Sequence, residues 1–163
     1  MTSRLEILRQ IIDCHHTIRS DIQRVDQCIN DLEVLFRIRG EYAALSQSSL
    51  ADLEIKKDKM RETFKTLESS LQKHFDHEEK CLPAILGEVL IKGLVVEHKA
   101  IREEIRAAND IIFSTIYDST VRNEPILLKS QLQQTITNLG QHIERHASRE
   151  EIVLDMAREG LEG

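Results

Sequence analysis

The sequence predicts an all-α protein, folded as an antiparallel up-down-up-down four-helix bundle. Aromatic residues make up 4% of the 163 residues, Trp is absent and Pro occurs twice, and this composition favours helices over strands. Apolar residues recur at steps of three and four along four long stretches, as they do in helices with one buried face. No linker divides the chain, so we expect residues 1–163 to form a single domain.

The first two predicted helices form one hairpin. Ser3 followed by Glu6 is typical of a capping box, and the first helix is expected to end before Gly40. The polar residues 46–49 can cap the second helix, which is expected to end near Pro83. The apolar positions are Leu8, Ile11, Ile12, Ile18, Ile22, Val25, Ile29 and Leu32 in the first helix, and Leu53, Met60, Phe64, Leu67, Leu71, Cys81 and Leu82 in the second.

The last two predicted helices form a second hairpin. Gly87 separates it from the first, and the third helix is expected to run on toward Tyr117. A polar loop is expected at residues 118–124, after which Pro125 suits the first turn of a fourth helix that frays at Gly160. The apolar positions are Leu90, Ile91, Leu94, Ile101, Ile105, Ala108 and Ile112, then Leu128, Leu132, Ile136, Leu139, Ile143, Val153 and Leu154. Short connections favour antiparallel neighbours.

Charge and hydropathy argue against a nucleic-acid partner, a membrane partner and a signal peptide. The formal charge is −6, and acidic residues are mixed with basic ones along the chain, so we expect no nucleic-acid partner. No apolar run approaches the roughly 20 residues of a membrane helix, so we expect no membrane partner. Charged residues within the first fifteen argue against a signal peptide and favour a cytoplasmic protein; they are Arg4, Glu6, Arg9 and Asp13.

The cysteines predict neither a disulfide framework nor a thiolate metal site. Cys14, Cys28 and Cys81 are odd in number and form no Cys-x-x-Cys pair. Each lies within an apolar helical stretch, as a reduced core thiol does.

Four of the seven histidines interrupt the apolar faces, one in each predicted helix; they are His15, His74, His98 and His146. Two of them carry a glutamate one turn later, at Glu78 and Glu150, and residues four apart project from the same side of a helix. Two unpaired carboxylates in an apolar core cost several kcal/mol. A pair of metal ions about 3.5 to 4 Å apart, bridged by both carboxylates, removes this cost.

An internal repeat supports the metal interpretation. His-x-x-Ile-Arg-x-x-Ile begins at His15 and again at His98, and His-x-x-x-Glu-Glu-x-x-Leu begins at His74 and again at His146. The chain is therefore expected to consist of two related helical hairpins. Each hairpin brings two histidines and one bridging glutamate to the centre. The expected metal ligands are His15, His74, Glu78, His98, His146 and Glu150.

Three nearby positions leave alternatives open. His142, one turn before His146, could supply a fifth nitrogen or a hydrogen bond, although a flank position is favoured. Glu151 could take the carboxylate role, although the repeat favours Glu150. His16 points about 100° away from His15. His77 lies on the flank of its helix and is expected to be exposed.

With these motifs the sequence resembles the hemerythrin-like family, in which an antiparallel four-helix bundle binds a di-iron centre through histidines and carboxylates. Residues 74–79, His-Phe-Asp-His-Glu-Glu, are similar to that family's His-Phe-x-x-Glu-Glu signature, and residues 146–151 are similar to its fourth-helix counterpart. The resemblance covers nearly the whole chain.

The ligand pattern is closer to one branch of that family. Oxygen-carrying hemerythrins have a third-helix His-x-x-x-His, whereas here His98 is followed by Arg102. Four histidines and two glutamates are more similar to the branch that includes the repair-of-iron-centres proteins, which are linked to nitric oxide and oxidative stress. That branch often adds an N-terminal cysteine-containing module, which we do not expect here because the first helix begins almost at Met1.

The resemblance implies two iron ions with an oxo or hydroxo bridge, and imidazole with carboxylate suits iron or manganese better than structural zinc. We expect a small diatomic ligand or peroxide to bind there, in oxygen sensing or in a response to oxidative or nitrosative stress. Phe75, Leu71, Ile101 and Ile143 are expected to line the centre. The alternatives are an iron store or donor for cluster repair, and an oxidase, peroxidase or nitric oxide reductase that takes electrons from a donor protein. A helical interaction module whose histidines bind nothing is the last alternative.

Overall fold

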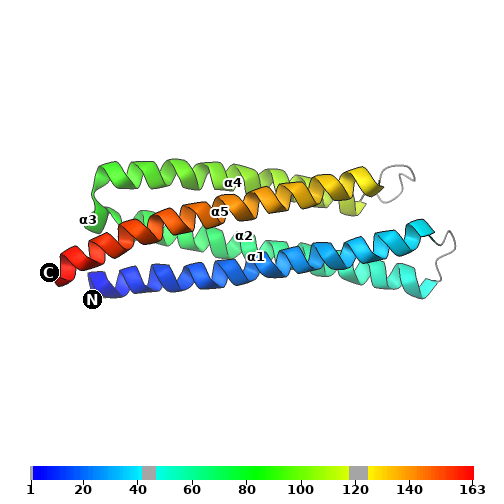
Figure 1. Ribbon diagram of the computed structural model, residues 1–163, viewed down its shortest axis with the longest axis horizontal. Coiled ribbons are helices and arrows are strands. Elements are labelled where there is room, and N and C mark those ends of the chain that lie inside the picture. The colour runs from blue at the N-terminus through cyan, green and yellow to red at the C-terminus, as the bar shows by residue number, and fades with distance from the viewer. Residues whose placement is uncertain (1, 42–46, 118–124) are drawn as a thin grey trace.

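The computed structural model describes residues 2–41, 47–117 and 125–163. Its helices are α1 (Arg4–Glu41), α2 (Gln47–Cys81), α3 (Pro83–Leu86), α4 (Glu88–Tyr117) and α5 (Pro125–Glu162), and these ranges contain no strand. The four long helices lie side by side with alternating direction, and both termini are at the same end (Figure 1). The predicted all-α bundle is confirmed.

The helix ends follow local chemistry. The Glu6 backbone N–H donates to Ser3 Oγ over 3.1 Å, as the capping box predicts. α2 ends at Cys81, and Pro83 begins the one-turn helix α3, because a proline fits a first turn but not a helix interior. Gly87 follows at φ +82°, a conformation that favours glycine, and turns the chain into α4.

Three predicted boundaries differ from the structure. α1 continues through Gly40 to Glu41 and α5 continues through Gly160 to Glu162, since one glycine costs a long helix only about 1 kcal/mol relative to alanine. Residues 47–49 belong to the first turn of α2. Ser46 and the loop predicted at 118–124 lie outside the described residues.

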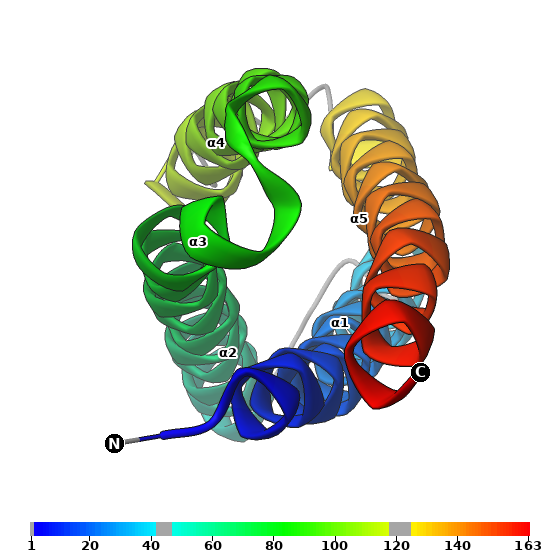
Figure 2. The same cartoon turned by 90° about the vertical axis from the view of Figure 1, so that its left-hand side faces the viewer.

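Each long helix packs against two others. α1 contacts α2 and α5, and α4 contacts the same two helices, so α1 and α4 lie diagonally opposite (Figure 2). This arrangement places the first and third helices of the predicted repeat in equivalent positions. None of the helices in the described ranges is long and apolar enough to cross a membrane.

The interior consists of three layers along the bundle. A large group of buried apolar side chains, here called the apolar layer, contains Ile18, Val25, Phe64, Leu67, Leu71, Phe75, Ile101, Ile105, Leu132, Leu139, Ile143 and others. A smaller group toward the termini, the end cluster, contains Leu8, Ile11, Leu82 and Leu154. Between them along each helix lie the buried polar side chains of the site layer: His15, His74, Glu78, His98, His146 and Glu150.

Candidate metal centre

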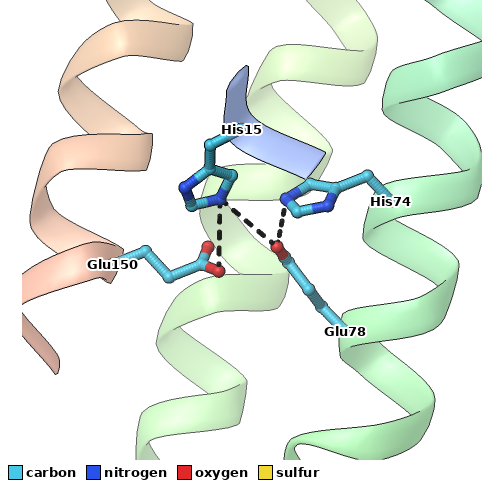
Figure 3. Close-up of side chains that lie close together, drawn as sticks. All are labelled: His15, His74, Glu78 and Glu150. Carbon is cyan, nitrogen blue, oxygen red and sulfur yellow. Dashed lines mark ion pairs between the residues drawn. The ribbon is translucent and has the colours of Figure 1, made fainter. Parts of the chain in front are cut away.

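The six predicted ligands come together in the site layer. Each is at most 4% exposed, and they project from α1, α2, α4 and α5 toward the bundle axis. They form two groups of four, and in each group one ligand atom per residue lies within 4.8 Å of the others. The first group is His15, His74, Glu78 and Glu150 (Figure 3). The second is His98, His146, Glu78 and Glu150.

Both glutamates belong to both groups because each divides its oxygens between them. Oε1 of Glu78 contacts His74 Nε2 and lies 3.8 Å from His15 Nε2, whereas Oε2 lies 2.9 Å from His98 Nε2. Oε1 of Glu150 lies 3.6 Å from His15 Nε2, whereas Oε2 lies 3.0 Å from His146 Nε2. A carboxylate placed in this way presents one oxygen to each of two cations.

These inward atoms have no hydrogen-bond partner among the described residues. They are the Nε2 atoms of all four histidines and both carboxylate oxygens of Glu78 and Glu150. Buried polar groups are nearly always satisfied, and a cluster of unsatisfied ones points to a missing partner such as a bound ion. The donor set of imidazole nitrogens and carboxylate oxygens fits a divalent or trivalent cation.

The electrostatics of the cluster are strongly coupled. Burial opposes ionisation of Glu78, but the surrounding imidazoles of His15, His74 and His98 outweigh it and hold the pKa of that carboxyl well below its usual range. Burial also opposes protonation of His15, yet the carboxylates of Glu150 and Glu78 raise its pKa to about 10. Glu150 and Glu97 likewise raise the pKa of His146 against burial. The carboxylates therefore attract positive charge into the layer.

Three of the four imidazoles are oriented from behind by a carboxylate. His15 Nδ1 lies 3.0 Å from Glu151 Oε1, His98 Nδ1 lies 2.9 Å from Glu79 Oε1, and His146 Nδ1 contacts Glu97 Oε2. A carboxylate can only accept, so Nδ1 carries the proton and donates it. In the neutral ring that binds a metal, the lone pair of Nε2 then faces the centre, as a metal ligand requires.

Arginines hold the carboxylates in turn. Arg19 donates to Glu151 over 2.9 Å and Arg102 donates to Glu79 over 3.0 Å. Arg149 donates to Glu97. The guanidinium groups anchor the glutamates that orient the histidines.

The four residues predicted to line the centre, Phe75, Leu71, Ile101 and Ile143, are all buried, and Phe75 lies directly against its histidines. The Phe75 ring stacks on His98 with centroids 4.0 Å apart and lies 5.8 Å from the His146 ring. The Arg102 guanidinium lies 5.4 Å from the Phe75 ring centroid. Phe75 therefore fixes ring orientation and keeps water from this side.

A surface groove borders the centre between α4 and α5. It encloses about 380 Å³, and Leu90, Leu94 and Val153 are among its apolar walls. Glu97 and Glu150 also line it. Glu150, one of the two glutamates shared by both groups, lies at the groove, while its carboxylate oxygens are buried on the side of the centre.

The remaining histidines lie outside the cluster. His142 is half-buried, and its Nδ1 donates to Glu104 over 2.6 Å. His16 is exposed. His77 is half-buried, with Nδ1 3.6 Å from Cys81 Sγ, so the prediction of an exposed His77 is wrong. The neighbouring cysteine reduces its exposure.

The cysteines are all free, but only Cys28 is a buried core thiol. Cys14 and Cys81 are half-buried, so the expectation of three core thiols is too broad. Cys14 directly precedes His15 on α1, and burial, and next the Glu78 carboxylate, raises the pKa of its thiol.

The supporting role of the carboxylates behind the histidines was not predicted from the sequence. Glu151 stands behind His15, and Glu150 faces the cluster. A signal for two of the three was present, because Arg19 with Glu151 and Arg102 with Glu79 occupy matching positions of the repeat. Glu97 had no such signal, since the matching position is Cys14.

Comparisons with known proteins agree with this geometry. A family model described as Hemerythrin HHE cation binding domain matches residues 6–157. Comparison with curated proteins and with solved structures gives no match. The matched range contains all six clustered side chains, and the buried histidine and glutamate groups fit a cation site.

Proposed function

The chain belongs to the hemerythrin HHE cation-binding domain family, and on this basis we propose that it is a non-haem di-iron protein that binds dioxygen, nitric oxide or peroxide. One observation carries the proposal: Glu78 and Glu150 each turn one oxygen toward each histidine pair. A single ion would not need both oxygens of both carboxylates, whereas two ions would.

Two iron ions bound there would supply open coordination positions and electrons for a small ligand. Each group offers four protein ligands, about two fewer than an octahedral ion accepts. An oxo or hydroxo bridge and an external ligand can fill the difference. The ligand set therefore suits binding or redox chemistry better than a purely structural role.

The surrounding residues favour a small uncharged ligand. Apolar walls dominate the groove beside Glu150, and Phe75 covers the histidines on the side of the apolar layer. A charged or bulky substrate would lose hydration there, and the charged pair that lines the groove, Glu97 and Arg149, is already formed between these two side chains. Dioxygen and nitric oxide are weakly hydrated, so they lose little hydration free energy on entering an apolar groove. The proposed function includes a role in oxygen sensing or in the response to oxidative or nitrosative stress, and membership of the repair-of-iron-centres branch stays a prediction.

Anaerobic loading with Fe²⁺, followed by separate exposure to dioxygen, peroxide and nitric oxide, tests the proposal. We expect about two iron ions per chain and a new optical band with at least one of the three ligands. A stable band without turnover indicates a binding protein or sensor, and consumption of the ligand with an electron donor indicates an enzyme. Rapid transfer of iron to a chelator indicates a store or donor.

The control is the double variant Glu78→Ala/Glu150→Ala, which retains all four histidines. We expect it to bind no iron pair and to give none of the bands. Wild-type protein that retains less than about one ion per two chains after loading would contradict the di-iron proposal and favour a metal-free interaction module.

A further inference from the structure

The structure repeats one arrangement on opposite sides of the centre. His15 on α1 donates to Glu151 on α5, and Arg19 holds that carboxylate. His98 on α4 donates to Glu79 on α2, and Arg102 holds that carboxylate. The distances agree to within about 0.1 Å, as near two-fold symmetry requires.

The symmetry fails for the other two histidines. His146 Nδ1 donates to Glu97, the residue before His98. The equivalent of His146 is His74, and the residue before His15 is Cys14, so a thiol stands where the second half has a carboxylate. Among the described residues, His74 Nδ1 is buried and has no hydrogen-bond partner.

This difference changes how well each histidine binds a metal. A carboxylate behind Nδ1 fixes the tautomer and the ring orientation and increases the basicity of Nε2, and its loss typically lowers metal affinity by about 10- to 100-fold. A neutral thiol is only a weak acceptor. His74 lacks the support that His15, His98 and His146 have.

We propose that the two metal positions differ in metal affinity because Glu97 supports a histidine of only one of them. The α4–α5 position, built on His98 and His146, has two oriented imidazoles. The α1–α2 position, built on His15 and His74, has one. The α4–α5 position therefore fills first and holds its ion more tightly, and Glu97 is its positioning residue. This inference rests on the proposed dinuclear centre.

Titration of the metal-free chain with Co²⁺, followed by calorimetry and by visible absorption, tests the inequality. Mutual repulsion of two bound ions separates the two steps even in a symmetric centre, so the deciding result is which step each variant moves. We expect Glu97→Cys, which copies Cys14, to weaken the tighter step by about 10- to 100-fold. We expect Cys14→Glu, which copies Glu97, to strengthen the weaker step by a similar factor.

Two control variants test whether these shifts are specific to the carboxylate behind the histidine. Glu104→Gln removes a carboxylate that accepts from His142, outside the centre, and is expected to move neither step. Cys14→Ala is also expected to move neither, because the thiol gives no support to lose. A weaker second step in Cys14→Ala would make the thiol itself a donor and overturn the inference. Circular dichroism and the Tm of each metal-free variant confirm folding.

The outcomes distinguish this inference from the function it rests on. Uptake of fewer than two ions by every folded variant contradicts the dinuclear function. Uptake of two ions with equal affinity by the wild type, or steps that do not respond to Glu97→Cys and Cys14→Glu, contradicts the inequality and leaves the function standing.

Discussion

On α2, Leu71 faces the apolar layer, while His74 and Glu78, within two turns of it, face the site layer. The two layers use the same four helices and both are buried, but they differ in how the loss of hydration is compensated. Leu71 and its neighbours lose water and gain dispersion contacts, which is favourable without any partner. The nitrogen and oxygen atoms of the site layer lose water and gain few hydrogen bonds.

Two buried charges elsewhere in the bundle pair with side chains that reach solvent, although Asp21 Oδ2 has no hydrogen-bond partner among the described residues. Lys57, 2% exposed, lies 3.6 Å from Glu54, which is 68% exposed, and buried Asp21 lies 3.3 Å from exposed Arg24. In the site layer the six clustered side chains are themselves all buried, and their inward atoms face one another. The apolar layer therefore needs no partner, whereas the site layer needs compensating positive charge, which a cation at its centre would supply.

The largest expected effect is on metal binding in the Glu78→Ala variant, which should lose its metal. Both groups lose an oxygen ligand, so affinity should fall by more than the roughly 10- to 100-fold typical of a supporting residue. The measurement is metal content after loading and desalting. His77→Ala is the matched control on the same helix, because His77 contacts Cys81 rather than the cluster. If His77→Ala lost metal and Glu78→Ala kept it, the assigned face of α2 would be wrong.

The next change concerns the apolar layer alone. Leu67 is 2% exposed among buried apolar neighbours, so Leu67→Ala should lower the free energy of unfolding by about 2 to 5 kcal/mol. Urea unfolding measures this change. Metal content should stay at that of the wild type, since Leu67 lies in the apolar layer about two turns of α2 away from His74.

Ile55→Ala serves as the matched control for Leu67→Ala. Ile55 also lies on α2 but is 64% exposed, so its truncation should change stability by no more than about 0.5 kcal/mol. Equal losses from the two variants would contradict the layered interior.

Helix periodicity was sufficient to predict the fold and the six clustered side chains. A buried stripe fixes which face of a helix points inward, and His74 with Glu78 or His146 with Glu150 then share that face. The one-turn helix α3 was not predicted, because Pro83 marks a helix end and a helix start equally well.

The contacts of the supporting carboxylates could not be predicted because they run between helices, even where the repeat marks the residue. Glu97 and His146 are 49 residues apart, and Glu79 and His98 are 19 apart. Their contact depends on which helices are neighbours and on the rotation of each helix about its axis. Spacing along one helix determines neither of these.

A smaller effect is expected on the stability of the whole chain. Metal binding in the site layer should raise the free energy of unfolding. A ligand that binds only the folded state at 100 times its Kd adds about 3 kcal/mol per site. Unfolding of the chain with and without Co²⁺ measures this gain. Glu78→Ala should show little of it, whereas Leu67→Ala should show all of it from a lower starting stability. A gain of equal size in Glu78→Ala would mean that Co²⁺ stabilises the chain from another site.

The mildest change lies outside both layers, at the exposed Gly93 of α4. A Cβ added there meets no atom within 4 Å, so Gly93→Ala should stabilise the chain by about 0.5 to 1 kcal/mol by reducing backbone freedom in the unfolded state. Gly140 on α5 is the contrasting position, because a Cβ there lies 3.3 Å from Ile22 Cγ2. Gly140→Ala should gain less, since the packing between α1 and α5 must shift to admit the methyl group. Urea unfolding distinguishes the two variants. Equal increases in the free energy of unfolding would show that α1 and α5 admit the methyl group without loss of packing energy.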